Sequence, residues 1–310
     1  MKNTLLHHYK NGNVDVKIYE NGTKVREWPD GEKPVSEYPE SADVKITGWC
    51  DMSHICKYCH EQSNLEGQHG DLDALARVWE TQKPGTEMAI GGGNPLAHPD
   101  LYHFLVKMKG LSIIPNVTVN IMHMKKFAPT IKMYQADKLI YGLGISYRGP
   151  QSLGLLPADI DYKNVVFHMI LGIHTLDDCR AVIDWCVRRD IMPKILLLGY
   201  KTYGNGITCY TEELKQTLEV WKELYLKALL NSEANVVISF DNLAIEQLDL
   251  KSQVKPEIWD ELFQGNDGNH TMYFDAVKQV VARTSTTAER FTFNQESDIR
   301  DLFNKVKVAA

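Results

Sequence analysis

Strand-like and helix-like segments alternate regularly between residues 43 and 240. The strand-like segments are short and mostly apolar or β-branched: residues 43–49, 87–90, 116–120, 138–146, 165–171, 194–198 and 235–240. Helical patterns of about 10–15 residues between such strands are typical of βα units, whose strands run parallel in one sheet. About six such units are fewer than the eight of a closed barrel. We therefore expect an α/β protein built on a partial (βα)6 barrel, with residues 235–240 as its last buried strand.

Two less regular regions flank this alternation. Residues 14–28 contain two alternating runs joined at Asn21-Gly22, which predicts a β-hairpin because both residues accept positive φ. Residues 241–310 mix short helical patterns with a segment, 271–281, that fits either a strand or a helix. The sequence therefore predicts an N-terminal extension with a β-hairpin (1–42), the barrel (43–240) and a C-terminal α/β extension (241–310).

Charge and cysteine content limit the classes of function. The 310 residues carry 34 basic and 40 acidic side chains, a net charge of −6, which argues against an extended nucleic-acid-binding surface. No run approaches the roughly 18 apolar residues of a membrane span, and the first residues lack the apolar core of a signal peptide. Six cysteines, three of them scattered, do not form a disulfide framework. We therefore expect a cytoplasmic protein with no membrane association.

The other three cysteines fall within ten residues, directly after the first predicted barrel strand. Cys50, Cys56 and Cys59 have the spacing C-x5-C-x2-C. Such a loop can ligate an iron–sulfur cluster, and three thiolates on a four-iron cluster would leave one iron open to a small molecule. The same thiols could instead bind zinc with His54 or His60 as the fourth ligand, as in a non-catalytic zinc-stabilised α/β protein.

Further polar or flexible residues stand at the carboxyl ends of the next predicted strands. Gly91, Gly92 and Gly93 follow the second strand, Asn120 ends the third and Ser146 ends the fourth. In parallel α/β sheets the chemistry collects at these ends. The cysteine loop and these residues are therefore expected to form one site.

With these motifs in place, residues 43–240 resemble the radical S-adenosylmethionine (radical SAM) superfamily. The resemblance is carried by the cysteine loop, with Tyr58 just before the third cysteine, and by the segment Ala-Ile-Gly-Gly-Gly-Asn-Pro-Leu-Ala-His-Pro at residues 89–99. Two features depart from the superfamily pattern. The first cysteine gap is two residues longer than the usual C-x3-C-x2-C, and Asn94 replaces the usual acidic residue after the glycines.

The resemblance implies a cofactor site and a chemistry. Three cysteines would hold a [4Fe–4S] cluster whose open iron binds S-adenosylmethionine, which is cleaved reductively to a 5′-deoxyadenosyl radical that abstracts hydrogen from an unidentified small molecule, nucleotide or peptide. An electron donor such as flavodoxin or ferredoxin is implied. The residues implied to bind the cluster are Cys50, Cys56 and Cys59, and those placed around S-adenosylmethionine are Tyr58, Gly91, Gly92, Gly93, Asn94, Asn120, Ser146, Leu198, Tyr200 and Lys201.

Four other residues have two interpretations each. His168 either points toward substrate from its apolar strand or is a buried core histidine. Asp241 either contacts substrate or caps the next helix. Cys179 and Cys186, seven apart on one amphipathic helix, are expected to be small core residues rather than ligands of a second cluster.

Overall fold

A ten-stranded sheet dominates the structure, a computed structural model that describes residues 4–20, 22–231, 235–263 and 265–307. The spatial order is β10-β9-β8-β7-β6-β5-β4-β11-β12-β13. Seven strands, in chain order, run parallel: β4 (Ser41–Thr47), β5 (Glu87–Gly92), β6 (Ile114–Asn120), β7 (Gly142–Ser146), β8 (Val165–Ile170), β9 (Lys194–Leu198) and β10 (Val237–Phe240). The predicted α/β class with a large parallel sheet is therefore confirmed. Within the described residues its strands do not close into a barrel.

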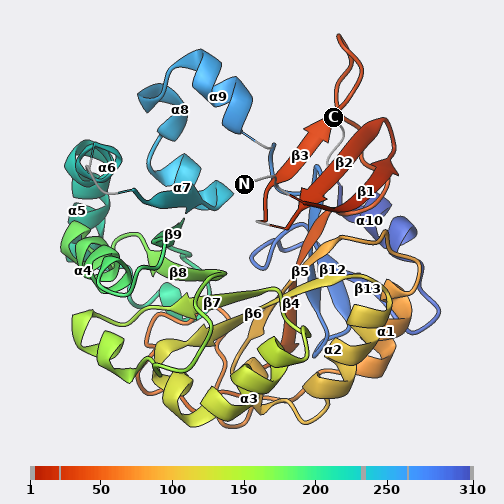
Figure 1. Cartoon of the computed structure of the whole chain (residues 1–310), viewed down its shortest axis with the longest axis horizontal. Coiled ribbons are helices and arrows are strands. Elements are labelled where there is room, and N and C mark those ends of the chain that lie inside the picture. The colour runs from red at the N-terminus through yellow and green to blue at the C-terminus, as the bar shows by residue number, and fades with distance from the viewer. Residues whose placement is uncertain (1–3, 21, 232–234, 264, 308–310) are drawn as a thin grey trace.

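Helices cover the outer, convex side of this curved sheet, as Figure 1 shows. The side chain of Asp71 accepts a hydrogen bond from the Ala74 amide at the start of the first helix, and Thr175 with Asp178 forms a capping box. The helices of this layer are α1 (Leu72–Trp79), α2 (Leu101–Gly110), α3 (Met124–Ala136), α4 (Leu176–Val187), α5 (Glu212–Val220) and α6 (Leu226–Leu230). A π-helical turn, Trp221–Tyr225, joins α5 to α6, so the helical segment they form is continuous but locally widened.

The core lies between the helices and the convex face of the sheet. Strand residues alternate between this core and the concave face, so β6 and β8 show a buried/half-buried alternation. Cys179 and Cys186 on α4 are fully buried, which confirms them as core residues. Because the helices occupy only one face, the concave face is left for a cavity.

A separate three-stranded antiparallel sheet precedes the main sheet. It consists of β1 (Leu5–Asn11), β2 (Val14–Tyr19) and β3 (Lys24–Glu27). The antiparallel pairing of β2 with β3 confirms the predicted hairpin, although Asn21 of its turn lies outside the described residues. Strand β1 was not predicted. Val14, Val16 and Ile18 pack against Ile114 at the start of β6, which attaches this sheet to the main one.

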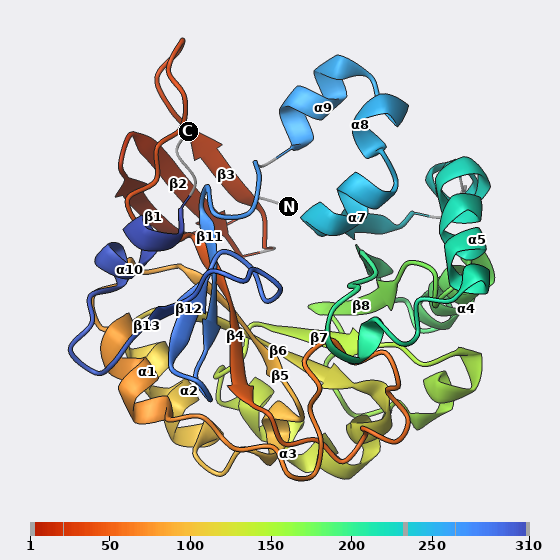
Figure 2. The same ribbon diagram turned by 180° about the vertical axis from the view of Figure 1, so that it is seen from behind.

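The C-terminal region adds three strands to the main sheet. They are β11 (Thr271–Asp275), β12 (Val280–Ala282) and β13 (Phe291–Thr292), so the segment 271–281 is two strands rather than a helix. Strand β11 lies parallel beside β4. Figure 2 shows β11, β12 and β13 beside β4. The division of the chain at residues 42 and 240 stays a prediction.

The position of strand β10 differs from the prediction. Residues 235–240 were predicted to be a buried strand, but β10 pairs with β9 alone and is an edge strand, with Val237 49% exposed. Four helices outside the outer layer complete the chain: α7 (Asn242–Gln247), α8 (Leu250–Gln253), α9 (Pro256–Leu262) and α10 (Ile299–Val306). None of the helices in the described residues is long and apolar enough to cross a membrane.

A buried histidine next to β11 predicts a pH-dependent stability. Burial, together with the positive charges of Arg26 and Lys24, lowers the pKa of His270 to about 3. The unfolded chain, with a histidine pKa near 6.5, binds a proton that the folded chain excludes, so stability is lost as pH falls from about 6.5 toward 3. Between pH 7 and pH 5, wild type should lose about 2 kcal/mol more stability than His270→Gln.

Urea unfolding of both proteins across this pH range measures the difference. The exposed His103 on α2 offers a control, because His103→Gln removes a histidine in contact with water. Parallel pH curves for wild type and His270→Gln would contradict the expectation.

Candidate functional site

A cavity of about 930 Å³ lies on the concave face of the sheet. It extends from the cysteine loop, at the carboxyl ends of the strands, to Thr23 and Glu87 near the N-terminal sheet. Alternate residues of the parallel strands line it: Asp43, Lys45, Glu87, Ala89, Gly91, Asn116, Thr118, Asn120, Gly142, Gly144, Ser146, Val166, His168, Ile170, Lys194, Leu196, Leu198, Val237 and Ser239.

All three cysteines of the loop line this cavity. Cys50 is buried just beyond β4, where its sulfur accepts a 3.4 Å hydrogen bond from the Met52 amide. Burial, together with negative charge on Cys56 and Cys59, raises the pKa of the Cys50 thiol to about 11. The three thiols therefore lie close enough for the charge on one to affect the pKa of another. No set of three or more His, Cys, Asp or Glu side chains in the described ranges is arranged to hold a single metal ion.

Two polar side chains approach Cys56 from neighbouring strands. Asn120, at the end of β6, donates its amide to the Cys56 sulfur over 3.5 Å. The Arg148 guanidinium, two residues beyond β7, donates to the same sulfur and to the hydroxyl of Tyr58, and it stacks 5.0 Å from the centre of the Tyr58 ring. A cation beside a thiolate stabilises its charged form. Of the predicted residues, Asn120 thus contacts Cys56 directly, and Tyr58 is linked to it through Arg148.

The glycine run packs against the start of the cysteine loop. A Cβ on Gly93 would lie 2.1 Å from the Trp49 carbonyl oxygen, and one on Gly92, whose φ is +108°, would lie 2.5 Å from the Thr47 oxygen. Close backbone approach therefore explains these two glycines. At Gly91 an added Cβ would meet no protein atom within 4 Å, although the residue lines the cavity. The protein's own packing gives no reason for glycine there.

Asn94, directly after the glycines, is a buried polar residue without a partner. Its side chain is 0% exposed, and neither the oxygen nor the nitrogen of its amide has a hydrogen-bond partner in the described part of the chain. Leaving such a group unsatisfied costs about 1–3 kcal/mol. The backbone amide of Asn94 donates to the Trp49 oxygen over 2.8 Å, which holds the residue next to the cysteine loop.

Solved structures with the same arrangement identify the fold. The structure of Streptococcus suis SuiB bound to S-adenosylmethionine matches with a TM-score of 0.61 and 13% identity, over 87% of this chain and 66% of SuiB. SuiB bound to its precursor peptide SuiA matches with a TM-score of 0.58 and 15% identity, over 87% of this chain and 65% of SuiB. The chain has the SuiB fold. The resemblance to radical SAM enzymes is therefore confirmed at the level of the fold.

The chain spans just under two thirds of the SuiB chain in these structures. No protein-family model matches it, and no curated protein matches its sequence. The similarity to SuiB is therefore one of three-dimensional structure.

The remaining predicted residues divide into two groups within the SuiB fold. Ser146, Leu198, Lys201 and His168 line the cavity. The register places Asn120, Ser146 and His168 side by side on β6, β7 and β8. Burial lowers the pKa of His168 to about 4, so its imidazole is neutral at pH 7.

Tyr200 and Asp241 lie outside the cavity lining. Tyr200 is 2% exposed, and its hydroxyl donates to the Gly206 oxygen over 2.7 Å. Asp241 caps α7, because one carboxylate oxygen accepts from the Ala244 amide at 2.7 Å and from the Gly199 amide at 2.8 Å. Burial raises the pKa of Asp241. These contacts account for the presence of both residues without a ligand.

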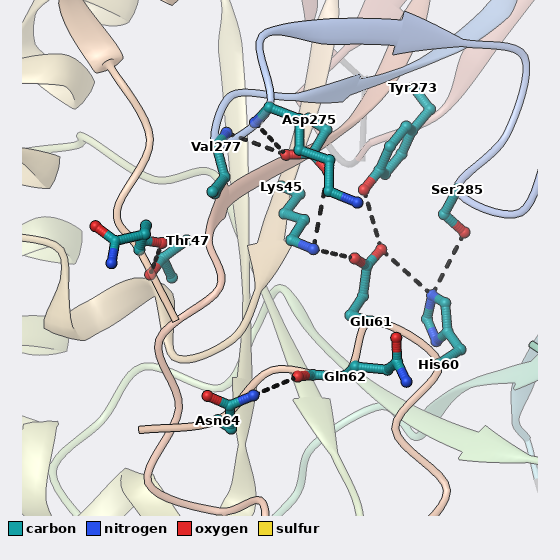
Figure 3. A network of polar contacts seen from close by, with 12 residues as sticks. Lys45, Thr47, His60, Glu61, Gln62, Asn64, Tyr273, Asp275, Val277 and Ser285 are labelled. Atoms are coloured by element: carbon teal, nitrogen blue, oxygen red, sulfur yellow. Dashed lines mark hydrogen bonds and ion pairs between the residues drawn. The ribbon is translucent and has the colours of Figure 1, made fainter. Parts of the chain in front are cut away.

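A buried polar network anchors the last residues of the cysteine loop, as Figure 3 shows. The Glu61 carboxylate lies 2.6 Å from the Lys45 ammonium on β4 and accepts the Tyr273 hydroxyl of β11 over 3.0 Å. Burial alone would raise the pKa of Glu61, but the His60 hydrogen bond and the Lys45 charge hold it well below its usual range. Asp275 of β11 lies 3.8 Å from Lys45. Glu61, two residues after Cys59, therefore joins the loop to two strands of the sheet.

Of the two histidines considered as zinc ligands, only His60 lines the cavity with the cysteines. His54 is exposed and is not among the residues that line the cavity. The His60 ring nitrogen Nε2 lies 3.5 Å from the Glu61 carboxylate and 3.4 Å from the Ser285 hydroxyl. Both contacts belong to the network of Figure 3.

Two residues of the site were missed at the sequence level. Arg148 lies two residues after the strand-end Ser146, a position that could have been flagged as a basic group beside the cysteine loop. Glu61 follows the third cysteine closely, but the sequence carries no sign of its contact with Lys45, 16 residues earlier.

Proposed function

We propose that the chain is a radical SAM enzyme whose cysteine loop holds a [4Fe–4S] cluster. The observation that carries the proposal is the joint position of Cys50, Cys56, Cys59 and Gly91 at the carboxyl-terminal end of one cavity in a SuiB fold. Bound there, the cluster would supply the electron that cleaves S-adenosylmethionine and yields a 5′-deoxyadenosyl radical, which abstracts hydrogen from substrate. In this proposal β4–β9 are the six strands of a partial (βα)6 barrel.

The residues around the thiols fit a negatively charged cluster. The three cysteines supply the soft thiolate ligands that such clusters require. Arg148 places a cation at Cys56, and Asn120 donates a hydrogen bond to the same sulfur. Hydrogen bonds to cluster sulfurs and nearby charge tune the reduction potential. These two side chains would therefore stabilise the thiolate ligands.

The glycine run fits the methionine end of S-adenosylmethionine. Gly91 leaves its Cβ position empty and open to the cavity, which allows a ligand to approach the backbone. The unsatisfied amide of Asn94 lies at the end of the same run. A ligand ammonium held by the backbone here would be shielded from water. Ser146, Tyr58, Leu198 and Lys201 line the cavity where the ribose and adenine would extend.

Replacing Gly91 with alanine tests this assignment. We expect Gly91→Ala to fold with unchanged thermal stability, because the new methyl group meets no protein atom. Its affinity for S-adenosylmethionine should fall about tenfold or more, since a methyl group forced into a close contact costs about 1–3 kcal/mol. Equilibrium binding of S-adenosylmethionine to the anaerobically reconstituted protein measures the effect.

Gly110→Ala is the matched control. A Cβ at Gly110, at the end of α2, also meets no protein atom, and this glycine does not line the cavity. Equal affinities for wild type, Gly110→Ala and Gly91→Ala would place S-adenosylmethionine elsewhere.

The partners follow from the chemistry. The cavity has room for a substrate beside the cofactor, and SuiB has been solved with its precursor peptide SuiA. We propose that the substrate of this chain, a peptide or another small polar molecule, enters the same concave face. One-electron reduction requires a donor such as flavodoxin or ferredoxin, and a reducing cytoplasm would keep the thiols free.

A further inference from the structure

Three polar side chains in the middle of the cavity form no hydrogen bond with another described side chain or backbone group. Asn116 and Thr118 project from β6, and His168 projects from β8, on either side of β7. Within the described part of the chain none of the three side chains has a hydrogen-bond partner. Polar groups that are half-buried and unpaired in a cavity are available to a ligand.

The glycines of β7 bring these side chains together. A Cβ on Gly144 would lie 2.6 Å from Cε1 and 2.8 Å from Nε2 of His168, and 2.9 Å from Oγ1 of Thr118. A Cβ on Gly142 would lie 2.6 Å from Oδ1 of Asn116. The neighbouring side chains therefore lean over β7 and occupy the space that its own side chains would fill. Thr118 and the nitrogen edge of His168 converge above Gly144.

Four charged side chains of the cavity have partners elsewhere. Lys45 pairs with Glu61, and Glu87 lies 2.5 Å from the Lys24 ammonium. The Lys194 ammonium donates to the Lys163 carbonyl over 3.2 Å, and the Lys201 ammonium to the Ser285 hydroxyl over 3.0 Å. Asn116, Thr118 and His168 therefore form an uncharged polar group, and the charged side chains line other parts of the cavity.

The three side chains offer both donors and acceptors without charge. Asn116 has an amide, Thr118 a hydroxyl, and His168 a neutral imidazole with one donor and one acceptor nitrogen. A neutral group that both donates and accepts satisfies such a set, whereas a buried charge without a counter-charge is strongly disfavoured. An amide is such a group, because its N–H donor and its carbonyl acceptor lie in one plane.

We propose that Asn116, Thr118 and His168 form a substrate-recognition subsite that binds an uncharged amide group, of a side chain or a peptide bond, over Gly144 of β7. The subsite deepens the proposed function, since it assigns the chemistry of the substrate that shares the cavity with the cofactor. Asp43 on β4 faces the same cavity, and burial raises the pKa of its carboxyl, which favours the uncharged form.

Three compounds of nearly the same shape test the charge preference. Acetamide is neutral, acetate is an anion and acetamidinium is a cation. Each is titrated into the full-length protein at pH 7.5 while the ¹H–¹³C signal of the His168 Cε1–H is followed by NMR; His168→Gln assigns that signal. We expect acetamide to shift the signal saturably and the two ions to bind at least about tenfold more weakly.

Thr118→Val provides a second variant, because it keeps the shape and removes the hydroxyl. The acetamide affinity should fall about two- to tenfold, the effect of one lost hydrogen bond. The proposal is overturned if either ion binds as tightly as acetamide, if no compound shifts His168, or if Thr118→Val leaves the acetamide affinity unchanged. The titration needs neither cluster nor S-adenosylmethionine, so its failure is distinct from failure of the proposed function.

Discussion

Cys56→Ala should abolish the formation of 5′-deoxyadenosine from S-adenosylmethionine and dithionite. Cys56 receives hydrogen bonds from Arg148 and Asn120 and lines the cavity with Cys50 and Cys59. A four-iron cluster held by three protein thiolates loses a corner ligand when one of them is removed. Chromatography of the reaction products after anaerobic reconstitution measures the effect.

Cys186→Ala is the control for this experiment. Cys186 lies on α4, 1% exposed and far along the chain from the loop, so its loss affects only packing. This variant should retain both iron and product formation. Undiminished product from Cys56→Ala would show that a different set of residues holds the cofactor.

Glu61→Ala should destabilise the protein by about 3 kcal/mol, because it removes the nearer partner of the buried Lys45 charge. The side chains of Lys45 and Glu61 are 8% and 14% exposed, and removal of the carboxylate leaves Lys45 with Asp275 at 3.8 Å. The Tyr273 hydroxyl loses its acceptor as well. Urea unfolding of the protein without bound cofactor measures the free energy of unfolding.

Two variants make this result specific. Glu212→Ala breaks an exposed pair with Lys215 on α5 and should cost less than about 1 kcal/mol. Lys45→Met combined with Glu61→Leu removes both charges and should recover much of the stability lost in Glu61→Ala. If Glu61→Ala costs no more than Glu212→Ala, the buried network does not anchor the cysteine loop.

Local sequence signals predicted much of the fold. The cap at Asp71, the capping box at Thr175 and the hairpin of β2 with β3 all depend on residues close together in the chain, and the predicted hairpin was confirmed. The insertion of β11 beside β4 and the exposed position of β10 depend on pairing between distant segments. A strand's apolar pattern does not reveal which neighbours it has, so the sequence left these features open.

In the candidate site, too, local motifs were predicted from the sequence, whereas contacts between distant segments were not. The cysteine spacing and the glycine run are visible in the sequence, and the structure brings them to one cavity. Position at a strand end was a weaker guide, because Asp241 turns to cap α7 instead of facing the cavity. Arg148 reaches Cys56 across 92 residues of sequence. Contacts of this kind follow from the packing of the sheet.

Metal analysis of the anaerobically purified protein tests the central claim most directly. We predict a brown protein that absorbs at about 400 nm and contains about four irons per chain. A colourless protein with a single zinc on the same cysteines would contradict the account and would indicate a zinc-stabilised α/β protein without radical chemistry.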